Sequence, residues 1–151
     1  MSHHGTRKNS SSHLSRWLRC REGASAVEFA IIFPLFLVVL FGIISFGAYL
    51  AVVHGVQQLA AEATRAAVAG LSDSERVTLA LDNINGNVNS YPMISSKRLT
   101  LTSASTDAAS QNFSVTLRYD ASDMFVFNLP VFAPQPSPII VRSASIQRGG
   151  Y

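Results

Sequence analysis

A long uncharged apolar run is the feature that most constrains the fold of this chain. Residues 29–53 read FAIIFPLFLVVLFGIISFGAYLAVV, which is 25 residues without a charged side chain. About 20 apolar residues are enough for a helix to cross the hydrocarbon core of a bilayer. Pro34 and Ser45 interrupt the run only mildly, and membrane helices tolerate both. The run therefore predicts one membrane-spanning helix, in agreement with a charged fraction of only 14%.

A secretory signal peptide is the main alternative, because it also combines a basic start with an apolar stretch. Its apolar region is about 7–15 residues long and ends at a small-residue cleavage site. Here the run is longer and continues into an Ala-rich helical pattern. These features favour a retained single-pass anchor. A secreted protein, cut after the run, is a further alternative and predicts a soluble fragment that begins beyond about residue 48.

The positive charge of the chain is concentrated before the apolar run. The formal net charge is +3, yet residues 1–23 hold five basic residues and one acid, a net of +4, and residues 24–151 hold seven bases and eight acids, a net of −1. Loops rich in Arg and Lys stay in the cytoplasm. We therefore expect a basic cytoplasmic leader at 1–23, a transmembrane helix at 24–53 and a small extracytoplasmic α+β domain at 54–151. The basic arm indicates topology and attraction to membrane lipids, and we expect no nucleic-acid partner.

The helical pattern continues beyond the apolar run. Apolar and small residues recur at intervals of three and four residues, which predicts one helix from Ala24 to Leu71 with an extracytoplasmic spine. Pro34 should kink or loosen this helix locally. Gly47, Ala51 and Gly55 form a small-xxx-small row that would let another helix approach closely. Small residues are also simply common in membrane helices, and the two interpretations have equal weight.

The second half of the chain changes from helical to strand patterning. Gly70 is a plausible helix end, and Ser72 to Glu75 has capping-box spacing for a second helix that carries Val77, Leu81, Ile84 and Val88. Alternating segments at 99–102, 113–119 and 138–146 predict three strands, with 103–111 as a connection of hairpin type. The predicted fold class is thus α+β: a long N-terminal transmembrane helix that continues into a spine helix, then a short helix and a small three-stranded antiparallel sheet.

The segment 123–136 is too apolar for an ordinary loop. It contains three prolines and many large apolar side chains, among them Met124, Phe125, Phe127, Leu129, Val131 and Phe132. It could pack under the sheet, cap the helix, or contact the outer leaflet or a partner. Packing in the core is the commonest fate of such side chains, and it is our expectation.

Residues suited to catalysis are scarce. After the apolar run the chain has one histidine, His54, and no cysteine, so it offers no Cys–His pair and no metal-ligand spacing. His3, His4 and His13 lie scattered in the polar N-terminal arm, where solvated histidines are the ordinary interpretation. No phosphate-binding loop and no nucleophile elbow is present. We therefore expect no enzyme, no cofactor, no metal and no small-molecule substrate.

The junction between the basic arm and the apolar run carries the most specific information. It reads REGASAVEF from Arg21 to Phe29, with Glu28 at the edge of the hydrocarbon region. A carboxylate there is costly, so a functional role with a partner is the default expectation. On the residues alone, however, Glu28 could reach the headgroups and Gly23 could be a flexible hinge.

This junction resembles a type IV prepilin processing site, with a Gly followed five residues later by a Glu beside an aromatic. VEFAIIFP, which begins at Val27, resembles the N-terminal signature of the TadE-like family, the minor pseudopilins of tight-adherence (Flp-type) pilus systems. The resemblance implies that a prepilin peptidase cuts between Gly23 and Ala24, and that Glu28 and Phe29 serve assembly. Ala24 and Glu28 then share one helical face, so the new amine could offset the carboxylate in its own chain or in a neighbouring subunit.

The resemblance also implies a function and a location. The chain would be a minor pseudopilin in the bacterial inner membrane, with its C-terminal domain in the periplasm, that supports assembly of an adhesive Flp pilus. Its partners would be the prepilin peptidase, other Tad pseudopilins and the pilus platform proteins. The alternative is an uncleaved single-pass periplasmic binding or sensor module, which predicts an intact Met1.

Overall fold

The computed structural model describes residues 14–129 and 135–147 of the chain. It divides into two compact units, Met1–Phe41 (unit 1) and Gly42–Tyr151 (unit 2). The order of elements along the chain confirms the predicted α+β class: a long apolar helix, a further helix and a three-stranded antiparallel sheet. The histidines of the N-terminal arm, His3, His4 and His13, lie outside the described residues, as do Val131 and Phe132.

The first helix, α1 (Leu14–Ala67), is 54 residues long and contributes to both units. It begins upstream of the predicted start at Ala24, so that Gly23 lies inside it, and it continues through Pro34. In unit 1 the large apolar side chains of α1 from Val27 to Phe41 are exposed, except that of Leu37, which is half-buried. Apolar side chains on all sides of a helix are typical of a membrane span. The part of α1 from Gly23 to Ala67 is long and apolar enough to cross a membrane.

The end of α1 lies four residues before the predicted end at Leu71. Val68, Ala69 and Gly70 form a turn in which the Gly70 N–H donates to the Ala67 carbonyl at 3.1 Å. The turn leads to α2 (Asp73–Asn87). The predicted stop near Gly70 is therefore confirmed, with the helix itself ending slightly earlier.

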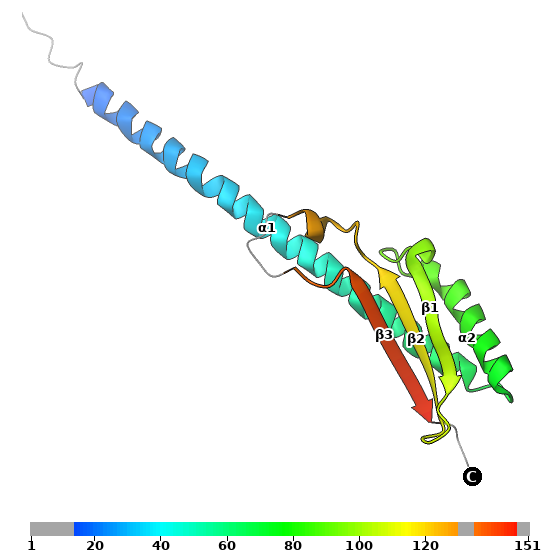
Figure 1. Cartoon of the computed structure of the whole chain (residues 1–151). Helices are drawn as coiled ribbons and strands as arrows, with labels where there is room; N and C mark the ends of the chain where they lie inside the picture. The colour runs from blue at the N-terminus through cyan, green and yellow to red at the C-terminus, as the bar shows by residue number, and fades with distance from the viewer. Residues whose placement is uncertain (1–13, 130–134, 148–151) are drawn as a thin grey trace, which may run out of the picture. The chain divides into compact units, whose positions relative to one another are not determined.

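In unit 2, α1 packs across one face of a sheet with the order β1-β2-β3 (Figure 1). The strands are β1 (Leu99–Thr106), β2 (Asn112–Asp120) and β3 (Ile139–Gln147), and both neighbouring pairs are antiparallel. Alternate residues of β2 are buried against α1, because successive side chains of a strand point to opposite faces. This core contains Val52, Val56, Leu59, Ala60 and Ala63 of α1 with Phe113, Val115, Leu117 and Tyr119 of β2.

The first strand is longer than its sequence pattern predicts. β1 continues through residues 103–106, which the sequence placed in the connection, and the pairing with β2 shifts between Leu101 and Ser103. The actual turn is short: the Asp107 carboxylate accepts hydrogen bonds from the backbone N–H groups of Ala109 and Ser110. The Ser110 hydroxyl also donates to it, and these bonds lower the pKa of Asp107 from its ordinary value.

The capping motif before α2 forms as predicted, with one difference. The Ser72 hydroxyl accepts from the Glu75 N–H at 3.2 Å, while the Glu75 carboxylate accepts from the Leu71 N–H, one residue before the position of an ordinary capping box. The buried side of α2 also differs from the expectation. Ile84 and, in η1 (Val88–Ser90), Val88 are buried, whereas Leu81 is 38% exposed and Arg76 and Ala80 face the interior.

The apolar connector after β2 packs partly in the core, which confirms the expectation for the described part of it. It contains η3 (Phe125–Asn128), where Val126 is buried and the Phe127 ring meets Tyr49 of α1 edge to face at 6.2 Å between centroids. Met124 also packs against the core, whereas Phe125 is exposed.

Candidate functional site

The predicted processing position lies inside α1 in unit 1. Gly23 and Ala24 have helical backbone and are exposed, and nothing lies within 4 Å of the place where a Cβ of Gly23 would stand. A helical bond must unwind before it can enter a protease as an extended strand. Glycine weakens a helix by about 0.5–1 kcal/mol relative to alanine, which makes that opening easier at Gly23. Among the described residues, nothing crowds the Gly23 side of this bond.

The predicted assembly residues follow within two turns. Glu28 lies four residues after Ala24, so both lie on one helical face, and its side chain is exposed. Phe29 stacks on Phe33 with ring centroids 5.1 Å apart, next to Pro34. Among the residues that the structure describes, no basic side chain forms an ion pair with Glu28. The Glu28 carboxylate thus stands at the start of an apolar surface, with no ion pair to any side chain that the structure describes.

The small-residue row of α1 lies in unit 2 and divides into an open and a covered part. Nothing approaches the missing Cβ of Gly47, and Ala51 is exposed. Gly55 is buried: its Cβ would stand 2.8 Å from the Ile94 Cδ1 and 3.3 Å from the Tyr91 Cδ1. Gly55 therefore permits close packing within the chain itself, while Gly47 and Ala51 leave room for a neighbouring helix. The role of the row in assembly stays a prediction.

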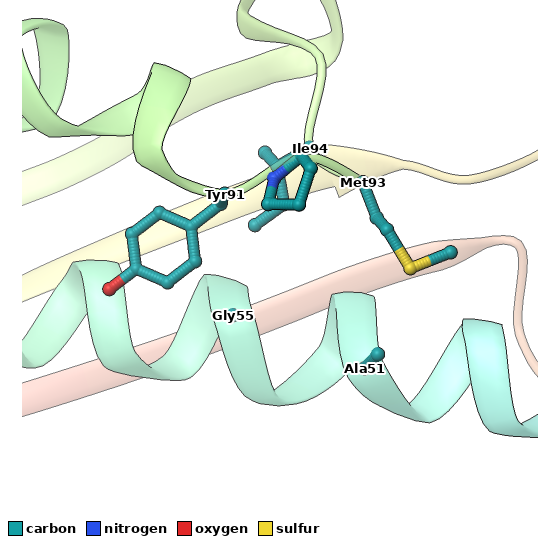
Figure 2. Close-up of a pocket in the computed structure, with 6 residues that line it drawn as sticks. Ala51, Gly55, Tyr91, Met93 and Ile94 are labelled. Atoms are coloured by element: carbon teal, nitrogen blue, oxygen red, sulfur yellow. The ribbon is translucent and has the colours of Figure 1, made fainter.

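A small apolar cavity lies beside this row. Its volume is about 150 Å³, and Ala51, Gly55, Tyr91, Pro92, Met93 and Ile94 line it. Figure 2 shows the segment 91–94 crossing over α1 at Gly55 and Ala51, with Met93 extending to the Ala51 side. The sequence analysis did not single out this segment. The only signal was a group of large apolar residues, Tyr-Pro-Met-Ile, between a helix and a strand.

A hydrogen bond holds this segment on α1. The Tyr91 hydroxyl donates to the Glu62 carboxylate at 3.0 Å. Partial burial, together with this carboxylate, raises the pKa of Tyr91 above its ordinary value. Tyr91 therefore stays protonated and continues to donate at any physiological pH. Among residues 14–129 and 135–147, no three His, Cys, Asp or Glu side chains gather as they would around a metal ion.

These observations define a class of protein: an apolar helix long enough to cross a membrane, joined to a small α+β unit. The comparisons add a likeness over part of the chain. The family model described as TadE-like protein matches residues 23–65, the stretch that contains all eight predicted processing, assembly and packing residues. This stretch of the chain, about a quarter of its length, is thus similar to TadE-like proteins, which agrees with the resemblance seen in the sequence. No curated protein and no solved structure matches the chain.

Proposed function

We propose that this chain is a minor pseudopilin, anchored in the bacterial inner membrane, that supports assembly of a tight-adherence (Flp) pilus and has a structural role without catalysis. The observation that carries the proposal is the TadE-like match over residues 23–65, which includes the exposed apolar part of α1. Other Tad pseudopilins and the platform proteins are its partners in this proposal, and a prepilin peptidase removes the leader.

The mechanism rests on the charge of Glu28. Cleavage between Gly23 and Ala24 creates an α-amino group four residues before this carboxylate, a rise of about 6 Å along the helix. A charged side chain at the centre of a membrane helix costs about 2.5–3.5 kcal/mol on insertion scales. A cation close by offsets part of that cost, because charges attract more strongly where the dielectric constant is low. The amine of the same chain or of a neighbouring subunit can therefore neutralise Glu28 and align two α1 helices.

The cleavage is tested by Gly23→Val, with Gly42→Val as the matched control in the same helix, since neither missing Cβ has a neighbour within 4 Å. We expect wild type and Gly42→Val to be shortened when the peptidase is present, whereas Gly23→Val stays at precursor length. Immunoblots with and without the peptidase, and N-terminal sequencing of the mature chain, give the result. A mature wild type that starts at Met1 would refute processing.

The assembly role is tested in the processed protein by Glu28→Gln, which removes the charge and keeps the shape. We expect normal cleavage but a several-fold loss of surface pili, counted by electron microscopy. Glu75→Gln, at an exposed position outside the apolar helix, is the control and should leave pilus number unchanged. Normal piliation of Glu28→Gln would show that the carboxylate has no part in assembly.

An uncleaved periplasmic binding or sensor module is the second candidate, and the cavity beside Gly55 is the observation that favours it. About 150 Å³ is room for a small apolar group rather than for a drug-sized ligand, whose sites are about 300–1,000 Å³. The two functions predict different N-termini, so that the sequencing experiment separates them.

A further inference from the structure

The length of the apolar run indicates where unit 2 meets the membrane. Residues 29–53 exceed by about five the number that a helix needs to cross the hydrocarbon core. The last residues of the run, from Tyr49 onward, then reach the headgroup region. Tyrosine is enriched at that depth, because its ring is apolar and its hydroxyl is polar. In the structure the Tyr49 hydroxyl donates to the Ser137 carbonyl at 3.0 Å, so the chain before β3 contacts α1 at this level.

Two segments of unit 2 pack on α1 around these residues. The segment 91–94 lies over Ala51 and Gly55 (Figure 2). η3 lies beside α1 (Figure 1), and its Phe127 ring meets the Tyr49 ring of α1. Each segment has one large apolar side chain that the core leaves uncovered. Met93 is 47% exposed and Phe125 is 56% exposed, and Leu50 of α1 is 51% exposed at the same level. Single exposed apolar residues are ordinary, but here three come from separate segments around one part of α1.

The charges near these segments balance. Lys97 and Arg98 of η2 (Ser96–Arg98) stand against Asp120 and Asp123. Arg98 forms an ion pair with Asp123, and the Ser122 N–H donates to Asp120 and keeps its carboxyl ionised by lowering its pKa. Arg118, which also acts on Asp120, and Glu62, which accepts from Tyr91, add one charge of each sign. The balance is then three to three, so these segments have no net charge with which to select an acidic or a basic protein. Their distinguishing property is apolar exposure at the depth of the lipid headgroups.

We propose that Leu50, Met93 and Phe125 form a lipid-contacting rim, through which unit 2 rests on the outer surface of the bilayer. The proposal rests on the membrane anchor of the proposed function. It accounts for the outward position of Phe125 within a connector whose neighbours Met124, Val126 and Phe127 pack inward. Because the nearby charges balance, the contact uses the apolar side chains and does not require anionic lipid.

The test uses tryptophan fluorescence of the full chain in vesicles of zwitterionic phosphatidylcholine. Trp17 is the only tryptophan, so Trp17→Phe gives a silent background. The probe is Phe125→Trp, and Met93→Trp repeats the measurement on the second segment. Leu71→Trp is the control, since Leu71 is 90% exposed in the turn after α1, about 27 Å of helix rise beyond Tyr49. Phe41→Trp reports on the apolar run itself.

We expect lipids brominated on their acyl chains to quench Phe125→Trp and Met93→Trp at least twofold more than Leu71→Trp, with emission shifted to shorter wavelength. Equal, weak quenching of Phe125→Trp and Leu71→Trp, with Phe41→Trp strongly quenched, would overturn the rim and leave the anchor intact. Weak quenching of Phe41→Trp would instead overturn the anchor. Quenching of Phe125→Trp only in anionic vesicles would overturn the apolar contact. A further outcome is that Phe125→Trp is protected from acrylamide in cells but is not quenched by brominated lipid. That outcome would assign the rim to a protein partner and would also overturn the lipid contact.

Discussion

Gly70 shows how one residue sets the geometry between two helices of unit 2. It is buried in the turn between α1 and α2, where its hydrogen faces the backbone of Arg76. A Cβ at this position would stand 2.9 Å from the Arg76 nitrogen and 3.1 Å from its Cα. Backbone atoms inside a helix cannot yield as the end of a flexible side chain can. The close approach of the turn to α2 therefore requires glycine.

We expect Gly70→Ala to lower the free energy of unfolding by about 1–3 kcal/mol, the usual cost of adding a group to a well-packed site. Gly86→Ala is the matched control: Gly86 lies inside α2 with nothing within 4 Å of its missing Cβ. It should raise stability by about 0.5–1 kcal/mol, because alanine favours a helix more than glycine. Urea unfolding of the full chain in detergent micelles, followed by circular dichroism, gives both values. Two variants of equal stability would contradict the contact.

At the residue scale, the sequence is most informative where the cause is local. The position of Gly70 before a capping motif predicts a helix end, and the position of Glu28 at the edge of an apolar run marks it as costly. Gly55 is different. Its spacing from Gly47 and Ala51 predicts packing between helices, yet the structure shows Tyr91 and Ile94 of the same chain over it. No local pattern indicates which distant segment folds onto a glycine.

At the element scale, the local sequence predicts where α2 begins but not which of its faces is buried. Ser72 and Glu75 satisfy backbone donors within four residues of themselves, so the sequence motif alone predicts the start of the helix. The buried face depends on tertiary packing. Arg76 is buried in place of Leu81, with its guanidinium 3.0 Å from Asp73 and its stem against Gly70. A prediction based on apolar residues alone leaves out Arg76 and therefore assigns the wrong face of α2 to the core.

The strand boundaries are likewise predictable only where the local pattern determines them. Alternation in β2 is strong because every second residue is buried, and its predicted range differs by only one residue at each end. Residues 103–106 of β1 are small and polar, and thus typical of a loop. They form a strand because β2 pairs with them, and because the Thr106 hydroxyl donates to the Asp73 carboxylate at 2.7 Å. This long-range support is absent from the local sequence.

We expect Ser72→Ala to destabilise the protein by about 1 kcal/mol, since it removes the side-chain acceptor of the Glu75 N–H at the N-cap. Ser74→Ala is the control, two residues further on and equally exposed, and it leaves the cap acceptor in place. Its effect should stay within about 0.5 kcal/mol, as for most surface substitutions. Thermal unfolding in micelles measures both, and equal losses for the two variants would show that the cap bond contributes nothing.

At the scale of the whole molecule, the charge distribution and the apolar helix together predict how the chain is oriented. The leader at residues 1–23 has a net charge of +4, whereas the rest of the chain has −1. The membrane potential and the translocation machinery retain such basic flanks on the cytoplasmic side. Neither the fold nor the family match contains this information. Orientation is thus a property that the sequence predicts and that an accessibility experiment has to establish.

Cysteine labelling decides the orientation, because Cys20 is the only cysteine and lies in the leader. In cells that lack the prepilin peptidase, a membrane-impermeant maleimide added to spheroplasts should leave Cys20 unmodified until the inner membrane is opened. The variant Cys20→Ser with Leu71→Cys should react before opening, since position 71 is highly exposed in unit 2. The reverse order would place the basic leader outside and invert the topology. Labelling of both positions in closed spheroplasts would mean that α1 does not span the membrane. The amine of Ala24 and the Glu28 carboxylate would then meet in water, where their attraction is about 1 kcal/mol at 4 Å. An attraction of that size is too weak to align subunits.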